Sequence, residues 1–406
     1  MSTIGLDLGT GAIKGVCWNP KDGILATASE RIPFLHPHEK WAELEPNAYC
    51  EQVLRFIREL AAASNDPING IAFAAASGNT MLCQRGDAQA PACQRGDAQA
   101  PPCAVTNIIS WLDKRLDWCP PVEWNVREVC GWPGIPSFPL MHLEYFRREC
   151  PELLASSTVA MNNDWLCWLL CGRHALDYSN GAPFYLFDQR TFTYHKPFLD
   201  HYGLKESQLP EMLPSGTTIG TLKKEFAGGN LTEKTRIVAG SFDHPAGARA
   251  AGVTKPGDLL LSCGTSWVGF YAVPKRDDVP AKGELCDTFQ APDGGCWGAM
   301  FSVSSIGLNV EQFVCERFGK GADRYAAFNN EAKKEGSPSR EKMREVVLRF
   351  KARLDQHVPF RKITVSGGPS EGETWPSVME EVLGLPVELS PYRSHTGAVG
   401  AAMLAN

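Results

Sequence analysis

An acidic residue stands inside a stretch whose other residues are suited to binding phosphate. In the sequence IGLDLGTGAIKGV, Gly9, Thr10 and Gly11 can present backbone N–H groups and a hydroxyl, and Lys14 adds a positive charge. Asp7 would repel phosphate unless a divalent cation lay between the two. We therefore predict a nucleotide phosphate loop with Mg²⁺ near Asp7. The alternative is a strand whose buried aspartate caps its own turn.

A second segment repeats this build without the acid. The sequence DLLLSCGTSWVGFYAV at 258–273 again places a Gly-Thr turn between two apolar strands, and Gly264, Thr265 and Ser266 offer hydrogen-bond donors. Taken alone, CGTS is common turn chemistry. Two hairpins of one build favour two lobes, with a cleft between them and a phosphate loop on each wall.

Asp243 precedes a run of alanine and glycine in GSFDHPAGARAAGV, which predicts a helix that approaches another backbone closely. A carboxylate at a helix N-terminus is stabilised as the anion, so one interpretation is an N-cap. The other is a general base that takes the proton from a substrate hydroxyl as it attacks phosphorus. His244 is a second candidate for the base and ranks behind Asp243.

The C-terminal part offers exposed backbone. The segment KITVSGGPSEGETWPSVMEEVLGLPVELS at 362–390 predicts strand, glycine-rich turn, helix and strand. Gly367 and Gly368 in the turn have no side chain to block a nucleoside. A small-residue helix, HTGAVGAAML at 395–404, is expected to pack at the hinge between the lobes.

Hydrophobic patterning supplies the elements that must position these residues. Strand-like runs at 3–8, 13–18 and 24–33, separated by glycine-containing turns, predict a β-meander. In PNAYCEQVLRFIRELAAAS at 46–64 the apolar residues recur at the helical period, and INGIAFAAAS at 68–77 follows as a buried strand. Strand, helix and strand in this order predict an α/β architecture.

A Gly- and Pro-containing boundary, LPSGTTIGTL at 213–222, precedes the strand TRIVAG at 235–240. We expect that strand to open a second lobe. The predicted division is therefore an N-terminal lobe of residues 1–234 and a C-terminal lobe of residues 235–406.

A ten-residue unit occurs twice in tandem, as CQRGDAQAPA at 83–92 and CQRGDAQAPP at 93–102. Two copies are too few for a solenoid, and their composition is that of turns. We predict a lengthened surface loop.

Composition excludes several classes of protein. The 406 residues carry 40 basic and 46 acidic side chains, a net charge of -6, and no Lys/Arg-rich run, which argues against a nucleic-acid partner. The 14 cysteines include no C-x-x-C pair, so we expect neither a disulfide framework nor a zinc site. We expect no leader segment, and no apolar run approaches the roughly 18 residues of a membrane helix. The expectation is a cytoplasmic protein without a membrane partner.

Taken in order from residue 4 to residue 404, the motifs resemble the FGGY family of carbohydrate kinases. That family lies in the actin, sugar kinase and Hsp70 superfamily, with duplicated ribonuclease H-like lobes and an interlobe cleft. The motifs that carry the resemblance are GLDLGTGAIKG, WAELEP at 41–46, ISWLDKR at 109–115, NNDWLCWLLCG at 162–172, DYSN at 177–180, GSFDHPAG, SCGTS and SGGP.

The resemblance implies ATP-dependent phosphorylation of a sugar or polyol hydroxyl. Asp243 would be the base, and Asp7 would hold Mg²⁺ through water. Phosphates would contact Thr10, Lys14, Gly264 and Thr265, while Gly367, Gly368 and Gly397 would flank the nucleoside. The implied sugar contacts are Asn79, Trp111, Asp113, Asp243, Trp41 and Glu43. For Trp111 the alternative is a core aromatic, and for Asp113 a local ion pair with Arg115.

Two departures from the family pattern stand out. Pro369 replaces a third glycine of the adenosine motif, which removes an N–H. A long C-lobe segment with P-Y-L and G-E-R signatures is missing, and the sequence leads directly into a helix capped by Ser337, with Pro338 in its first turn. We expect a compact member of the family, whose C-terminal lobe closes a sheet with fewer elements and whose chain stops sooner than in its relatives.

Three functions stay open at this point. The first is a sugar kinase, the second a catalytically degenerate sugar- or nucleotide-binding protein, and the third an actin- or Hsp70-like ATPase. Retention of Asp7, Thr10 and Asp243 favours the first. SGNTML at 77–82 contains neither a RET nor an MHG signature, so the sugar is unnamed, with a ketose or polyol expected. A homodimer is a family-level expectation.

Overall fold

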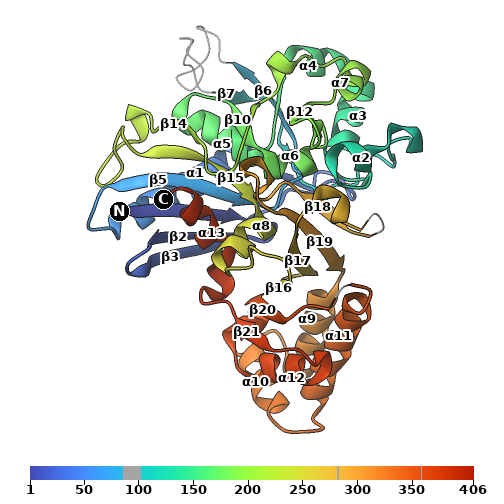
Figure 1. Cartoon of the computed structure of the whole chain (residues 1–406). Coiled ribbons are helices and arrows are strands. Elements are labelled where there is room, and N and C mark those ends of the chain that lie inside the picture. Colours follow the sequence, from blue (N-terminus) through green and yellow to red (C-terminus); the bar gives the residue numbers. More distant parts are fainter. Residues whose placement is uncertain (86–101, 281–282, 358) are drawn as a thin grey trace.

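Two six-stranded sheets form the centres of two lobes (Figure 1). The computed structural model describes residues 1–85, 102–280, 283–357 and 359–406. Most of the tandem repeat, residues 86–101, lies outside the described residues. No helix in the described ranges combines the length and apolar composition needed to cross a bilayer.

The first sheet begins with the predicted meander. Its order is β14 (Thr218–Thr221), β15 (Arg236–Phe242), β5 (Ile68–Ala75), β1 (Ser2–Leu8), β2 (Ala12–Asn19) and β3 (Gly23–Arg31). The pairs β1–β2 and β2–β3 are antiparallel, whereas β1–β5 and β5–β15 are parallel. The α/β prediction is confirmed.

The second sheet repeats this arrangement. Its order is β18 (Leu285–Asp287), β19 (Trp297–Val303), β17 (Trp267–Val273), β16 (Asp258–Cys263), β20 (Lys362–Gly367) and β21 (Val387–Leu389). Here too an antiparallel hairpin, β16–β17, is followed by parallel pairing of β16 with β20 and of β20 with β21. The second sheet therefore has as many strands as the first.

One expectation about the lobes is wrong. The strand predicted at 235–240 forms as β15, but it pairs with β5 in the first sheet and does not open the second. Gly240 permits this pairing, because a Cβ there would lie 1.8 Å from the carbonyl oxygen of Phe73. The chain passes from the first sheet to the second after α8 (Asp243–Ala250). A boundary at 234/235 would therefore separate β15 from the other strands of its own sheet.

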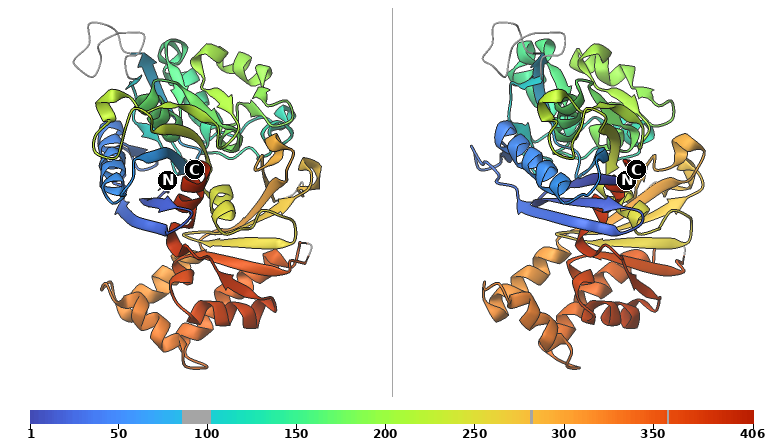
Figure 2. Two further views of the ribbon diagram at one scale, coloured as in Figure 1. Left: turned by 60° about the vertical axis from the view of Figure 1, so that its left-hand side comes forward. Right: turned by 90° about the vertical axis from the view of Figure 1, so that its left-hand side faces the viewer.

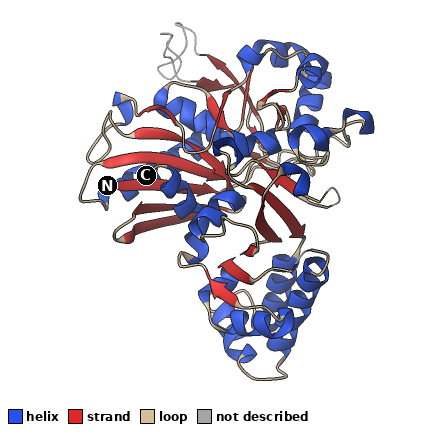
Figure 3. Cartoon of the chain, viewed as in Figure 1, coloured by secondary structure: helices blue, strands red, loops and turns tan. Residues whose placement is uncertain are grey.

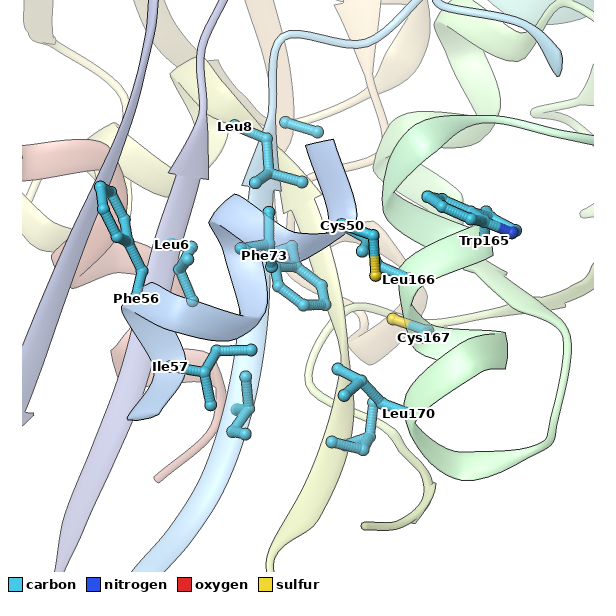
Figure 4. Packing of buried hydrophobic residues seen from close by; sticks show 14 of the residues in the cluster. Leu6, Leu8, Cys50, Phe56, Ile57, Phe73, Trp165, Leu166, Cys167 and Leu170 are labelled. Carbon is cyan, nitrogen blue, oxygen red and sulfur yellow. The ribbon is translucent and has the colours of Figure 1, made fainter. Parts of the chain in front are cut away.

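Helix α1 (Pro46–Ala62) covers the first sheet and positions its strands. Glu45 caps it by accepting the N–H groups of Asn47 and Ala48. The helix then buries its apolar face with Phe56 and Ile57 against the sheet (Figure 4). Cys167 of α5 (Asn162–Cys171) lies in the same apolar core.

The helical part of the second lobe comprises α9 (Ile306–Phe318), α10 (Arg324–Ala332), α11 (Pro338–Leu354) and α12 (Thr374–Leu383). Figure 3 shows these helices gathered at the end of the lobe away from the first sheet. Ser337 caps α11 through the N–H of Arg340, and Pro338 stands in its first turn, as predicted. The apolar side of α11 packs into the core of this lobe.

The remaining elements of the first lobe surround the end of its sheet. The helices are α2 (Val126–Cys130), α3 (Pro139–Glu149), α4 (Pro151–Ser156), α6 (Tyr178–Phe184) and α7 (Lys196–Tyr202). Short sheets join β7 (Pro102–Ala104), β6 (Met81–Arg85) and β9 (Thr158–Ala160); β4 (Glu43–Leu44) and β8 (Ile108–Ile109); β10 (Ala175–Asp177) and β13 (Glu211–Leu213); and β11 (Phe187–Asp188) and β12 (Thr193–Tyr194).

The C-terminal helix α13 (Thr396–Leu404) returns to the first sheet, so the two termini lie side by side in both views of Figure 2. The helix forms where the small-residue pattern predicts one, and it packs between β1 and α8. A Cβ on Gly5 would stand 1.9 Å from the carbonyl oxygen of Ala398, and one on Gly400 would stand 1.9 Å from that of Ala246. Glycine on both sides of α13 therefore allows close backbone contact.

This packing gives a stability prediction. Gly400→Ala is expected to lower the free energy of unfolding by about 2 to 3 kcal/mol, because its methyl group has no space beside α8. Urea unfolding checks it. Gly228→Ala is the control, since a Cβ there meets no atom within 4 Å. Equal stability of the two variants would contradict the close contact of α13 and α8.

Candidate active site

A cavity of about 330 Å³ lies where the turns of the two sheets meet. Asp7, at the end of β1, and Lys14, on β2, line it from the first lobe. Gly264, after β16, and Gly367, at the end of β20, line it from the second. Asp243, the first residue of α8, lines it as well. The structure thus brings together five residues that the sequence singled out in four separate segments.

Asp7 has an unsatisfied oxygen in this cavity. Its Oδ1 atom is buried and has no hydrogen-bond partner in the described part of the chain. Burial, and after it the charge of Asp243, raise the pKa of Asp7 to about 7, while Lys14 and His244 act in the opposite direction. A buried carboxylate oxygen without a donor suits a divalent cation.

The described residues contain no cluster of three His, Cys, Asp or Glu side chains that could hold a metal ion. A cation here would therefore be held by Asp7 together with oxygens of water or of a bound phosphate. Lys14 lies at the same cavity, with Nζ donating to the carbonyl oxygen of Ser394 at 3.0 Å.

Asp243 is the first residue of α8, and Phe242 occupies the N-cap position. Asp243 is therefore not the N-cap residue of this helix. Its Oδ1 accepts the N–H of His244 at 2.7 Å. Burial raises the pKa of Asp243 to about 7, which suits a general base near neutral pH. Burial also lowers the pKa of His244 to about 4, so that imidazole is neutral and weakly basic.

A larger cavity of about 510 Å³ adjoins the first one in the second lobe. Cys263, Gly264 and Gly368 line both cavities, so the two spaces meet at the second Gly-Thr turn. Thr265 lines the larger cavity, and the remaining walls come mainly from α9, from α10 and from residues 368–371 after β20, with Trp375 of α12. A phosphate chain beside Asp7 and an attached nucleoside would find adjoining spaces here.

The adenosine motif is accommodated despite its proline. Pro369 stands in the first positions of a short 3-10 turn, η6 (Gly368–Glu371), where its missing N–H is not needed. Gly367 has φ +88°, and a Cβ there would lie 2.3 Å from the carbonyl oxygen of Cys263. Glycine is therefore required at this position.

Asn79 and Trp111 lie beside the first Gly-Thr turn, at a small pocket of about 10 Å³ that Gly9 and Thr10 also line. The indole Nε1 of Trp111 donates to Thr10 Oγ1 at 2.9 Å, and its backbone N–H donates to Asn79 Oδ1 at 3.1 Å. Trp111 is half-buried and packs against a hydrophobic core that includes Phe138, so the alternative of a core aromatic stays open. Thr10 faces this pocket and not the central cavity.

Asp113 and Glu43 form a buried cluster with Arg115. Arg115 Nη2 lies 2.5 Å from Glu43 Oε1 and 2.9 Å from Asp113 Oδ2, and its guanidinium lies 4.1 Å from the ring centre of Trp41. Each oxygen of both carboxylates already accepts a protein N–H. The ion pair of Asp113 with Arg115 is observed, and the structure brings neither carboxylate to the central cavity.

Three other predicted residues have different places. Gly11 is exposed, and the carbonyl oxygen of Ser266 accepts the N–H of Gly264 at 3.1 Å within the turn. Gly397 was expected beside the nucleoside, but it lines the central cavity, where a Cβ would lie 2.8 Å from Asp7 Oδ2. That placement is a correction: α13 brings Gly397 to the end of β1, next to Asp7.

Sequence reasoning missed a buried hydrogen-bond network behind Asp243. Ser179 Oγ accepts the backbone N–H of Phe242 at 3.0 Å and donates to Asp287 Oδ2 at 2.7 Å. Asp287 belongs to β18 of the second sheet, whereas Ser179 is in α6 of the first lobe. The network therefore ties the residue before Asp243 to both lobes. DYSN marked Ser179, but no local pattern marks Asp287.

The fold and the site together define a two-lobed α/β protein of the actin-like ATPase class, with the lobes meeting at Asp7 and Asp243. This chain belongs to the FGGY family of carbohydrate kinases. The model of that family's N-terminal domain matches residues 2–249, which includes β15 and nearly all of α8. The family expected from the motifs is confirmed.

Curated relatives are similar over part of their length. The xylulose kinase of Bacillus subtilis is 25% identical over 290 residues, which is 69% of this chain and 55% of the relative. The glycerol kinase of Rippkaea orientalis is 25% identical over 275 residues, 64% of this chain and 52% of the relative. The chain spans about half the length of the curated relatives it matches.

Solved structures share the fold over the whole chain. The ligand-bound xylulose kinase from Lactobacillus acidophilus has a TM-score of 0.82 at 16% identity and matches 100% of this chain and 88% of that one. The Plasmodium falciparum glycerol kinase with ADP has a TM-score of 0.81 at 14% identity and matches 99% of this chain and 88% of that one. The predicted two-lobed fold is confirmed by these likenesses.

Proposed function

We propose that this protein transfers the γ-phosphate of ATP to a hydroxyl of a small sugar or polyol, with Asp243 as the general base. The observation that carries the proposal is the meeting of Asp7 and Asp243 at one cavity between two glycine-containing turns. Membership of a carbohydrate kinase family supports it. The named activities of the relatives, xylulose and glycerol phosphorylation, make a ketose or polyol the acceptor to expect.

Different residues would act on the phosphates of ATP and on the acceptor hydroxyl. Lys14 and the backbone N–H of Thr265 would bind phosphate oxygens, with Gly264 leaving space for them, and Asp7 would hold Mg²⁺. The ion would supply charge neutralisation for the transferring phosphoryl group. Asp243 would accept the proton of the attacking hydroxyl, because its pKa of about 7 leaves it basic at neutral pH.

The acceptor would approach from the side of Asn79 and Trp111. An amide and an indole suit a polyol, since one binds hydroxyl groups and the other packs on a C–H face. The hydrogen bond from Trp111 to Thr10 joins this side to the first phosphate turn. The pocket there is small in this structure, so a sugar would enter as Trp111 moves.

The test is ADP release with Mg²⁺ and ATP against a panel of pentuloses, hexuloses, aldoses and polyols, with the mass of the product confirmed. We expect ADP release that depends on one or a few ketoses or polyols and gives a phosphorylated product. Release that is independent of any sugar would favour an actin- or Hsp70-like ATPase instead. Binding of ATP or sugar without turnover would favour a binding protein.

A further inference from the structure

The backbone that carries Asp243 is held from the second lobe. Ser179 Oγ, on α6, accepts the N–H of Phe242 at 3.0 Å and donates to Asp287 Oδ2, on β18, at 2.7 Å. Strand β18 lies beside α6 in Figure 1, and the serine and the aspartate are both fully buried. The Asp243 carboxylate accepts the N–H of the next residue at 2.7 Å, so its position follows that of this backbone.

The same part of the second lobe also holds the other end of α8. Arg249, in the last turn of the helix, donates from Nη2 to the carbonyl oxygen of Phe289 at 2.7 Å. Its guanidinium carbon lies 4.6 Å from the centre of the Phe289 ring. Phe289 in turn donates its N–H to Asp287 Oδ1 at 2.7 Å. One carboxylate of the second lobe is therefore linked to both ends of the helix.

Phe289 is held in a backbone conformation that is unfavourable for a large side chain. Its φ is +40°, in the left-handed region that favours glycine. The hydrogen bonds at its N–H and its carbonyl oxygen keep it there, together with the Phe270 ring at 5.0 Å between ring centres. Residues kept in such conformations by their surroundings cluster at functional sites. The strain therefore points to a role for residues 287–289 beyond joining β18 to β19.

We propose that Asp287 and Ser179 are positioning residues, which hold the N-terminus of α8 so that the Asp243 carboxylate can accept the proton of the acceptor hydroxyl. Asp243 lines the central cavity and these two side chains do not, so each would act through Asp243 and not on a substrate. Because Asp287 lies in the second lobe and Ser179 in the first, this support depends on how the two lobes are arranged. The inference rests on the proposed function in one respect, that Asp243 is the base.

A double-mutant cycle on the full chain tests this role. Sugar-dependent ADP release is measured for the unaltered protein, for Ser179→Ala, for Asp243→Asn and for the double variant, with kcat and the KM values for ATP and for the sugar. A residue that acts only by positioning Asp243 has nothing to position once the base is removed, so the cycle separates this role from a general loss of structure.

A second variant and a matched control complete the experiment. Asp287→Asn keeps the shape of the side chain but leaves one acceptor oxygen for its two donors, Ser179 and Phe289. The control is Ser64→Ala, in the turn after α1. Ser64 is also buried, and its hydroxyl likewise accepts a backbone N–H and donates to an oxygen, in this case both of Asp66. Thermal unfolding confirms that each variant is folded.

We expect Ser179→Ala to lower kcat about 10- to 100-fold with KM values within about twofold, and Asp287→Asn to lower kcat to a smaller extent. Ser64→Ala should leave kcat unchanged. In the Asp243→Asn background, Ser179→Ala should lower kcat further by less than about twofold.

Two results would overturn the positioning role while the kinase function stands. One is an equal loss of kcat from Ser179→Ala in both backgrounds, and the other is an unchanged kcat in both Ser179→Ala and Asp287→Asn. If the unaltered protein releases no ADP with any sugar, the proposed kinase function fails, and this inference falls with it.

Discussion

Asp243→Asn is expected to lower kcat about 10³-fold while leaving the binding of ATP and of the sugar nearly unchanged. The substitution keeps the size of the side chain and removes its basicity. It also removes a negative charge that raises the pKa of Asp7, so the cation site should not be weakened. Sugar-dependent ADP release and equilibrium binding measure the two parts of this prediction separately.

The pH profile gives a second readout of Asp243. Burial raises its pKa to about 7, so the fraction in the basic form rises tenfold per pH unit below about 7 and levels off above it. We expect kcat/KM to follow this curve and the Asn variant to lose the rising limb. Replacement of surface Glu or Asp residues elsewhere should leave the rising limb of kcat/KM unchanged.

His244→Gln distinguishes the two candidate bases. His244 Nε2 lies 3.7 Å from Asp243 Oδ1, and its pKa is lowered to about 4. If Asp243 is the base, His244→Gln should reduce kcat by less than about tenfold. A larger loss for His244→Gln than for Asp243→Asn would assign the proton transfer to the imidazole instead.

Local patterns predicted most of the elements but not all of their partners. The turn after β1 follows from a hairpin pattern within fifteen residues of the sequence. The strand β15 was also found, yet it was placed in the wrong sheet, because an apolar strand packs equally well in either lobe. Its partner β5 comes far earlier in the chain, and pairing over that distance leaves no local signature.

The site shows the same limit at the level of side chains. Asp7, Lys14 and Asp243 were identified because they stand in glycine-rich motifs, and the structure brings them to one cavity. Asp113 lies in a motif that was equally suggestive of a sugar contact. Its carboxylate instead forms an ion pair with Arg115, two residues later. Ser179 lies in the DYSN motif, but its hydrogen-bond partner Asp287 lies in β18 of the other lobe, and only the packing of the two lobes brings them together.

Asp7→Asn is expected to have opposite effects on stability and on activity. Burial and the charge of Asp243 raise the pKa of Asp7 to about 7, so without Mg²⁺ the folded protein binds this proton more tightly than the unfolded chain does. Stability of the wild type should therefore fall as the pH rises from about 4 to about 7. The Asn variant has no buried carboxylate to ionise, so its free energy of unfolding at pH 8 should exceed that of the wild type by roughly 1 to 3 kcal/mol.

Activity should change in the other direction, by about 10²- to 10³-fold downward, because the ligand of the cation is lost. Mg²⁺ should raise the melting temperature of the wild type in the presence of ADP and leave that of the Asn variant nearly unchanged. The matched control is Asp117→Asn, an exposed aspartate of the first lobe. A variant that is less stable than wild type at pH 8 without Mg²⁺ would mean that Asp7 serves the fold, as a turn cap, and not a cation. Gained stability with lost activity is the combination that a structural aspartate cannot produce, since a residue kept for folding has no reason to carry an unfavourable buried charge.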